Sequence, residues 1–445
     1  MGKGVEGVTK LELARKGTVT PEMRQVCAAE GLAEEALRQE VAAGLVVIPA
    51  NVRHAGLRAV GIGRGLRTKV NANIGTSPDR GTTEGELEKL KAALEAGADT
   101  VMDLSTGGDL DKVRRAVIEH CPAPVGTVPI YQAAIEAGGP EEMSLAGYLG
   151  VFERHARDGV DFATVHAGVR REAMPLVARR LMGIVSRGGA FLARWMDARG
   201  RENFLYEHFD DVLAIAREYD VTMSLGDGLR PGCIEDATDE AQLHELRVLA
   251  ELAERCRDGG VQVMIEGPGH VPLEQIEENV RLEKEWCAGA PFYVLGPLPT
   301  DVAPGYDHVV SAIGGGLAAA AGADFLCYVT PREHVGLPDA DDVREGVMTA
   351  RIAAHVGDLA KGLAGARELD RRMSQARAAR DWDAMLEHAL TSCRFGEMLG
   401  SEDRSDRCSM CGEFCAVKLF RERPREAHEA EQGGAGADKQ KARQG

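Results

Sequence analysis

The stretch TKVNANIGTSPDRGTTEGELEKLKAALEAGADTVMDLS, residues 68–105, decides the fold. It begins with a short β-type run (68–75), continues through an amphipathic helical segment (84–97) and ends in a second β-type run (98–105). A helical crossover returns the chain to the same end of a sheet, so the two strands that it joins lie parallel. The stretch therefore predicts one strand–helix–strand unit of an α/β protein.

The same alternation continues along the chain and predicts a barrel. Further β-type runs occupy 123–130, 161–168, 182–189, 221–228, 261–269, 291–297 and 324–330. Repeated strand–helix units over about 270 residues suit an α/β fold of the (β/α)8 TIM type, which we expect over residues 61–340. A doubly wound open sheet is the competing architecture. The nine candidate strands are one more than a barrel of this type holds.

The segments outside the barrel differ in composition. Residues 1–60 predict a helical N-terminal segment, and 341–400 predict a helical C-terminal region. Residues 401–420 form an arm that contains a cysteine cluster, and 421–445 lack apolar residues, so we expect a disordered tail there. The glycine-rich GIGRGLR (61–67) precedes a strand instead of linking a strand to a helix, which argues against a dinucleotide-binding fingerprint.

Charge and composition exclude some classes of partner. The chain has 53 Lys and Arg against 70 Asp and Glu, a net charge of −17. This balance argues against nucleic acid or an anionic membrane as the main partner, although a local pocket can still bind a small anion. We find no signal peptide and no membrane-spanning stretch, and we expect a cytoplasmic protein. In that compartment the ten cysteines are thiols or metal ligands rather than disulfides.

Polar residues follow nearly every predicted strand. Barrel active sites form at the carboxyl ends of the strands, so these side chains would face one funnel. Each of them alone has a simpler interpretation, a group that fixes a loop by a hydrogen bond; their recurrence favours a common site. The candidates are Asn73, Met102, Asp103, Tyr131, His166, Ser186, Arg187, Asp227, Arg230, Glu266, His270, Tyr293 and, just past the last strand, His334.

Some of these stretches indicate particular ligands. SRGG (186–189) combines a hydroxyl, a guanidinium and glycines, a composition that suits a phosphate or forms an ordinary glycine turn. In GDGLRPG (226–232), Asp227 and Arg230 pair with each other or bind one polar substrate. His270 and His334 lie on stiff loops at neighbouring strand ends, where two imidazoles can share a metal such as zinc.

The cysteine cluster CSMCGEFC, residues 408–415, has the spacing C-x2-C-x3-C. A structural zinc site would need a fourth ligand, for which Cys393 or His428 is available. A [4Fe–4S] cluster normally takes four thiolates, so three would leave one iron open to bind a small molecule. Enzymes that cleave S-adenosylmethionine reductively use such an open iron. The spacing alone leaves both interpretations open.

Motifs spread along the chain now permit comparison with a known family. NANIGTSPD, ADTVMDLSTGGDL, GIVSRGGAF, LGDGLRPGCI, EGPGHVP, LCYVTPREH and CSMCGEFCAVK together resemble the phosphomethylpyrimidine synthase family of thiamine biosynthesis, from about residue 8 to 420. The resemblance implies a (β/α)8 barrel in a radical S-adenosylmethionine enzyme. Longer members carry an extra N-terminal domain, so this chain resembles the short branch. The cysteines of those members have the spacing C-x2-C-x4-C, whereas only three residues separate the last two cysteines in this chain.

The resemblance also implies roles for individual residues. His270 and His334 would bind a second metal, usually zinc, and Cys408, Cys411 and Cys415 would bind the [4Fe–4S] cluster. Glu266 and the three cysteines would be catalytic. The implied substrate ligands are Asn73, Met102, Tyr131, His166, Ser186, Arg187, Gly188, Asp227, Gly228, Leu229, Arg230, Glu266 and Tyr293.

The implied reaction is a lyase reaction in thiamine biosynthesis. 5-Aminoimidazole ribonucleotide becomes 4-amino-5-hydroxymethyl-2-methylpyrimidine phosphate, with formate, carbon monoxide, 5′-deoxyadenosine and methionine. Three alternatives stay open: a paralogue that forms 5-hydroxybenzimidazole from the same nucleotide, a zinc-dependent barrel lyase or hydrolase with a structural zinc, and a non-catalytic nucleotide-binding protein.

Partners follow from the same resemblance. It implies an electron donor such as flavodoxin or ferredoxin, and a homodimer. The helical region 341–400 is too small to have much core of its own, so its apolar positions would pack on a partner subunit. These positions are Met348, Ile352, Leu359, Met385 and Leu390.

Overall fold

The computed structural model describes residues 7–399 and 410–421, and within them eight parallel strands close into a barrel. The strand order is β10-β3-β4-β5-β6-β7-β8-β9. This closure confirms the predicted TIM-type barrel and excludes the open sheet. The strands are β3 (Lys69–Ile74), β4 (Thr100–Asp103), β5 (Val125–Thr127), β6 (Phe162–Val165), β7 (Thr222–Leu225), β8 (Val263–Gly267), β9 (Phe292–Leu295) and β10 (Phe325–Cys327).

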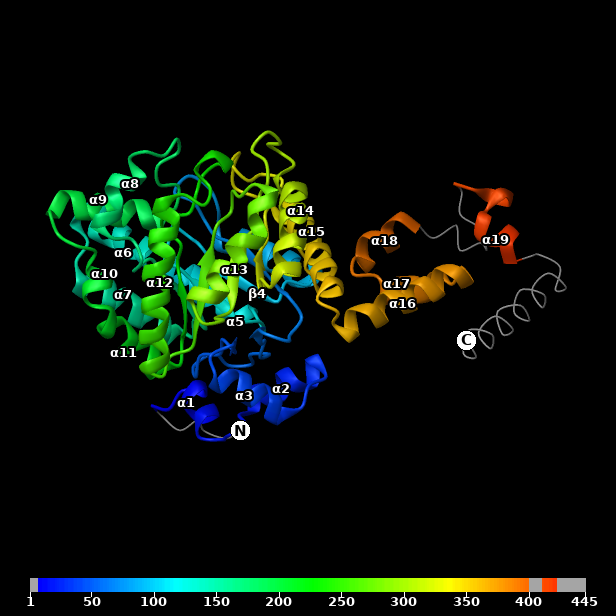
Figure 1. The fold of residues 1–445 in the computed structure, drawn as a ribbon, viewed down its shortest axis with the longest axis horizontal. Helices are drawn as coiled ribbons and strands as arrows, with labels where there is room; N and C mark the ends of the chain where they lie inside the picture. The colour runs from blue at the N-terminus through cyan, green and yellow to red at the C-terminus, as the bar shows by residue number, and fades with distance from the viewer. Residues whose placement is uncertain (1–6, 400–409, 422–445) are drawn as a thin grey trace, which may run out of the picture. The chain divides into compact units, whose positions relative to one another are not determined.

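Helices surround the barrel on its outer face (Figure 1). Sequence signals set their ends: Thr82 accepts the N–H of Gly85 at the start of α4, and Gly97 ends that helix in the left-handed conformation, φ 91°. The helices of this layer are α4 (Thr83–Ala96), α5 (Leu110–His120), α6 (Pro129–Ala137), α7 (Leu145–Asp158), α8 (Met174–Val177), α9 (Arg187–Arg199), α10 (Phe204–Glu207), α11 (Phe209–Tyr219), α12 (Glu240–Asp258), α13 (Ile276–Trp286), α14 (Asp307–Ala321) and α15 (Ala340–Ala360). Short 3-10 turns η1 (Pro140–Glu142), η2 (Arg171–Ala173), η3 (Ile234–Asp236) and η4 (Leu273–Gln275) lie between them.

The N-terminal segment is helical, as the sequence indicates, and it also contributes to a small sheet. It contains α1 (Lys10–Arg15), α2 (Pro21–Glu30) and α3 (Glu34–Ala42), and β1 (Val46–Val47) pairs antiparallel with β2 (Ile62–Gly63). Many of its apolar residues form a cluster of their own, whereas Val47, Val60 and Ile62 belong to the barrel core. A buried ion pair of 2.5 Å between Lys10 Nζ and Asp220 fixes it to the barrel.

The predicted strand at 182–189 is wrong, and without it the eight remaining predicted strands match the eight of the barrel. Residues 182–186 form no strand, and Arg187 begins α9. Gly183 has a φ of 63°, which interrupts extended backbone, and the Ser186 hydroxyl accepts the N–H of Gly189 at 3.2 Å, which starts a helix. The apolar pair at 184–185 resembled a strand in sequence alone.

Helix α15 packs on the barrel, so the first compact unit extends to Leu363, beyond the boundary expected at 340. Asp358 on α15 accepts hydrogen bonds from the N–H and hydroxyl of Thr68, at 3.0 and 2.7 Å, at the start of β3. Met348 is buried against the barrel's own helices and therefore needs no partner subunit, contrary to our expectation, whereas Ile352 is exposed.

The second unit begins at Ala364. It contains α16 (Ala364–Ala379), α17 (Trp382–His388), α18 (Ser392–Leu399), the turn η5 (Gly412–Phe414) and α19 (Ala416–Arg421). Met385 is buried within this unit. None of the described helices in either unit is long and apolar enough to span a bilayer. The predicted tail at 421–445 lies, after residue 421, outside the described residues.

Candidate active site

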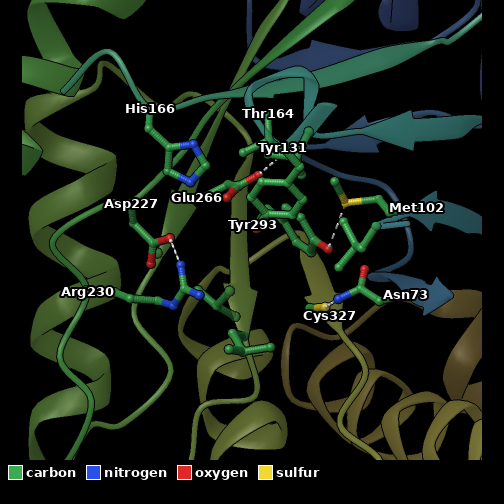
Figure 2. Close-up of a pocket in the computed structure, with 15 residues that line it drawn as sticks. Asn73, Met102, Tyr131, Thr164, His166, Asp227, Arg230, Glu266, Tyr293 and Cys327 are labelled. Atoms are coloured by element: carbon green, nitrogen blue, oxygen red, sulfur yellow. Dashed lines mark hydrogen bonds and ion pairs between the residues drawn. The ribbon is translucent and has the colours of Figure 1, made fainter. Parts of the chain in front are cut away.

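A cavity of about 100 Å³ opens at the carboxyl ends of the barrel strands. Figure 2 shows side chains from many strands turned toward this common space. Eight of the substrate ligands implied by the resemblance line it: Asn73, Met102, Tyr131, His166, Asp227, Arg230, Glu266 and Tyr293. The barrel brings them together because all parallel strands end at one rim.

One wall of the cavity is a network of weakly polar groups. The Tyr293 hydroxyl accepts a hydrogen bond from Asn71 at 2.8 Å and donates to the sulfur of Met102 at 3.6 Å. Asn73 Nδ2 donates to the sulfur of Cys327 at 3.1 Å. Burial raises the pKa of the Cys327 thiol to about 12, so the thiol is neutral at physiological pH.

Glu266 lies beside Tyr293, because the two residues are register partners on the adjacent strands β8 and β9. Its Oε1 accepts two hydrogen bonds of 2.7 Å, from the hydroxyls of Thr164 and Ser224. Burial raises the pKa of Glu266, while the two hydroxyls and the Arg230 guanidinium lower it. With Oε1 fixed in this way, Oε2 is the oxygen left to meet a ligand.

Asp227 and Arg230 form an ion pair across the loop that follows β7. Arg230 Nη1 lies 3.3 Å from Asp227 Oδ1, and Oδ2 is buried without a hydrogen bond among the described residues. Burial raises the pKa of Asp227 to about 7, although the Arg230 guanidinium favours the carboxylate. The predicted pairing of Asp227 with Arg230 is thus present, and Oδ2 of Asp227 keeps its capacity to accept a hydrogen bond.

His166 faces the same space as a neutral imidazole. Burial, together with the charge of Arg230, lowers its pKa to about 3. Its Nδ1 is buried and has no partner within the described part of the chain. A Cβ atom on Gly188 would lie 2.3 Å from the ring, so only glycine at that position lets α9 approach the imidazole.

Five of the implied substrate ligands lie beside the cavity rather than in its lining. Ser186, Arg187 and Gly188 begin α9, with the Arg187 guanidinium 4.9 Å from the centre of the Tyr131 ring. Gly228 and Leu229 lie in the loop after β7. The Leu229 side chain is fully buried in the core, so only its main chain is available to a ligand.

His270 and His334 lie together, with their ring centres 5.2 Å apart. Each Nδ1 faces a carboxylate: His270 is 2.7 Å from Asp301, and His334 is 3.3 Å from Asp307. A carboxylate on Nδ1 fixes the tautomer that presents Nε2 to a metal. The pair thus suits two-histidine coordination, although no group of three or more His, Cys, Asp or Glu side chains that could hold a metal occurs among the described residues.

Comparison with known proteins identifies the family. The model of the Radical SAM ThiC family matches residues 9–422. The chain belongs to the Radical SAM ThiC family. Phosphomethylpyrimidine synthase of Desulforudis audaxviator is 58% identical over 417 residues, which cover 92% of this chain and 96% of that protein. The enzyme of the same name from Moorella thermoacetica is 59% identical over 423 residues, covering 93% of this chain and 98% of that protein.

Membership in the Radical SAM ThiC family confirms the resemblance found in the motifs. It makes the chain an enzyme whose chemistry uses S-adenosylmethionine and an iron–sulfur cluster. The described cysteines of the arm fit that role, since Cys411 is exposed and Cys415 is half-buried, whereas Cys27, Cys121, Cys233, Cys256, Cys287 and Cys327 are buried. The two arm cysteines lie on either side of the single turn η5. Cys408 lies outside the described residues.

The site also contains residues that the sequence reasoning missed. Asn71, Thr164, Ser224 and Cys327 are all buried near or in the cavity. A period of two along each strand could have found Asn71 and Thr164, because Asn71 precedes Asn73 by two residues and Thr164 precedes His166 by two. Alternate residues of a barrel strand point to the same side.

Proposed function

We propose that the chain is a phosphomethylpyrimidine synthase of thiamine biosynthesis. It would convert 5-aminoimidazole ribonucleotide to 4-amino-5-hydroxymethyl-2-methylpyrimidine phosphate, with formate, carbon monoxide, 5′-deoxyadenosine and methionine as the other products. The observation that carries the proposal is the convergence of eight implied ligands on one cavity. The names of the relatives, at 58% and 59% identity, support the same activity.

The cavity's own groups match the chemistry of such a nucleotide. An aminoimidazole and a ribose are rich in N–H and O–H donors, and Asp227 and Glu266 present carboxyl oxygens to accept them. Neutral His166, which has one buried nitrogen without a partner, and Asn73 add groups that donate or accept hydrogen bonds. The walls hold the substrate in one orientation, which limits which hydrogen atom is within reach of a reactive carbon centre.

The phosphate of the substrate has a separate place at the start of α9. The amides of a helix N-terminus attract anions, and Arg187 adds a full positive charge there. The absence of a Cβ at Gly188 lets this helix end come close to His166 at the cavity edge. We assign phosphate binding to Ser186, Arg187 and Gly188.

The arm cysteines would hold the [4Fe–4S] cluster through Cys408, Cys411 and Cys415. When bound, the cluster supplies the electron for reductive cleavage of S-adenosylmethionine. The thiols of Cys411 and Cys415 flank one short turn, so both can reach a single cluster. An electron donor such as flavodoxin or ferredoxin would reduce it, and we propose that the chain acts as a homodimer.

His270 and His334 would hold a second metal, for which we propose zinc. Their paired rings and the carboxylates behind them support this assignment. Substrate or water would complete the coordination of a metal with only two protein ligands. The metal would then polarise a bound oxygen or nitrogen of the substrate.

Product analysis tests the proposed function. Anaerobically reconstituted enzyme is incubated with the nucleotide, S-adenosylmethionine and a reductant, and the products are identified by mass spectrometry. The pyrimidine phosphate together with 5′-deoxyadenosine is expected. Formation of 5-hydroxybenzimidazole would replace the proposal with the paralogue, and absence of 5′-deoxyadenosine from a protein with a full cluster would reject radical chemistry on this substrate.

A further inference from the structure

A second, smaller polar cavity lies behind the candidate active site. Its volume is about 20 Å³, and it shares Asp227, Arg230 and Glu266 with the substrate cavity. Its remaining polar lining comes from helices α12 and α13, with Gln242 and Glu245 on the first and Asn279 on the second. The loop after β7 therefore has the substrate cavity on one side and a buried polar layer on the other.

Glu245 is the group of this layer that contacts the loop. Its side chain reaches from α12, and its Oε2 accepts the N–H of Leu229 at 2.7 Å. The residue is only 2% exposed, and Oε1 has no hydrogen bond among the described residues. A Cβ atom on Gly228 would lie 3.3 Å from that Oε1, so the carboxyl packs directly against the loop's main chain.

The contact lies between the two residues that face the substrate. Leu229 is flanked by Gly228 and Arg230, and the N–H of Arg230 donates to the carbonyl of Asp227 at 3.1 Å. Fixing the main chain at Leu229 consequently fixes the origin of both the Asp227 and the Arg230 side chains. The Leu229 side chain, fully buried in the core, holds the same residue from the other end.

The charges around Glu245 explain why a carboxyl is tolerated there. The buried carboxyl groups of Asp227 and Glu245 and the half-buried Glu266 line this cavity together with the guanidinium of Arg230. Burial, with the charge of Asp227 adding to it, raises the pKa of Glu245 well above its usual value. A neutral acid can still accept the Leu229 N–H through its carbonyl oxygen.

We propose that Glu245 is a positioning residue for the substrate-binding loop. Its carboxyl fixes the main chain at Leu229 and so sets where Asp227 and Arg230 meet the nucleotide. The assignment of the nucleotide rests on the proposed function, but the role of Glu245 in holding the loop rests on the contacts above. Nothing in this role requires Glu245 to touch the substrate.

Three variants of the full-length enzyme test the proposal. Glu245→Gln keeps an oxygen that accepts the Leu229 N–H, and matches the neutral acid in shape. Glu245→Met has a similar volume but no oxygen acceptor, which leaves a buried amide unpaired. Glu254→Met makes a Glu→Met change at an exposed position of the same helix and serves as the matched control.

The affinity for 5-aminoimidazole ribonucleotide, its KM, kcat and the thermal midpoint are measured for each variant. We expect Glu245→Met to raise Kd and KM about ten- to hundred-fold, the effect of one buried unpaired amide, with a smaller change in kcat. Glu245→Gln should stay within about threefold of the unmodified enzyme, and Glu254→Met should match it.

The outcomes separate this role from a purely structural one. A Glu245→Met enzyme with lowered thermal stability but unchanged Kd and KM overturns the proposal, as does a Glu245→Gln enzyme as impaired as Glu245→Met. If Glu245→Met does not fold, Glu245→Asp, which withdraws the carboxyl by one methylene, replaces it with the same expectation. If the unmodified enzyme binds the nucleotide but forms no pyrimidine, only the proposed function is rejected. The Kd of the nucleotide for each variant still tests the role of Glu245.

Discussion

Gly189 offers a sharp test of how the candidate site is assembled. It is the third residue of α9, and its Cα faces the loop after β7. A Cβ atom at this position would lie 2.2 Å from the carbonyl oxygen of Gly228 and 2.8 Å from its Cα. Both atoms belong to main chain, so no side chain can turn away to make room. The change to test is Gly189→Ala.

The expected effect follows from these distances. A carbon and an oxygen at 2.2 Å are about 1 Å closer than unstrained contact allows, so α9 and the loop must separate by about that amount. Overpacking of this kind costs about 1–3 kcal/mol of stability, which the better helix propensity of alanine offsets by about 1 kcal/mol. A displacement of 1 Å in a binding site costs about a hundredfold in activity, so kcat/KM should fall by about two orders of magnitude while the protein still folds.

Gly150→Ala is the matched control. Gly150 lies within α7, and a Cβ there would meet nothing within 4 Å, so the same change should raise the thermal midpoint slightly and leave kcat/KM unaltered. Steady-state kinetics and thermal unfolding of both variants give the comparison. A Gly189→Ala enzyme with the kcat/KM of the unmodified protein would show that α9 and the loop are not in contact as described.

Three further predictions concern the carboxylates and the cluster. Asp301→Asn should weaken binding of the second metal about 10- to 100-fold, because it removes the carboxylate that lies 2.7 Å from His270 and orients its imidazole. Competition with a chelator measures the metal affinity, and an unchanged affinity would contradict the prediction. The double change Thr164→Val and Ser224→Ala removes two hydrogen bonds that favour ionised Glu266, so the pKa of Glu266 should rise further and acidification should abolish activity at a higher pH than in the unmodified enzyme. An unchanged pH profile of activity would show that the reaction does not need the Glu266 carboxylate. Cys411→Ala should abolish the visible absorption of the cluster and cleavage of S-adenosylmethionine while nucleotide binding persists, and normal iron content in that variant would refute cluster ligation.

The sequence predicted the barrel and most of the cavity lining for one physical reason. Parallel strands end at a common rim, so polar residues that follow successive strands must converge whatever the details of packing. Asn73, His166 and Glu266 are far apart in the chain, yet their positions at strand ends sufficed to place them together. The motifs were also enough to recognise the family, which the family model confirms.

Local patterns failed where a short segment admits two conformations. The run 182–189 has the apolar residues of a strand, but Gly183 interrupts extended backbone and Ser186 begins a helix. Met348 has the spacing of a helix face that needs a partner, but the barrel itself supplies the surface. For 182–189 the decisive features are local ones that the apolar pattern hides, whereas for Met348 the decisive contacts come from elsewhere in the chain.

What the sequence by itself determined is the alternation of strands and helices, the rim where polar residues gather, and the family to which the chain belongs. Only the tertiary structure decided which groups support the residues of the site. The carboxylates Asp301 and Asp307 lie 31 and 27 residues from the imidazoles that they face, and Glu245 lies 16 residues from the amide that it accepts. No periodicity links such pairs, because each contact depends on how a helix or loop folds over the barrel rim. Burial then sets the charge of the carboxyl groups. A carboxyl group on the surface ionises freely, whereas burial raises the pKa of Asp227 and Glu245 because few water molecules remain to solvate the carboxylate.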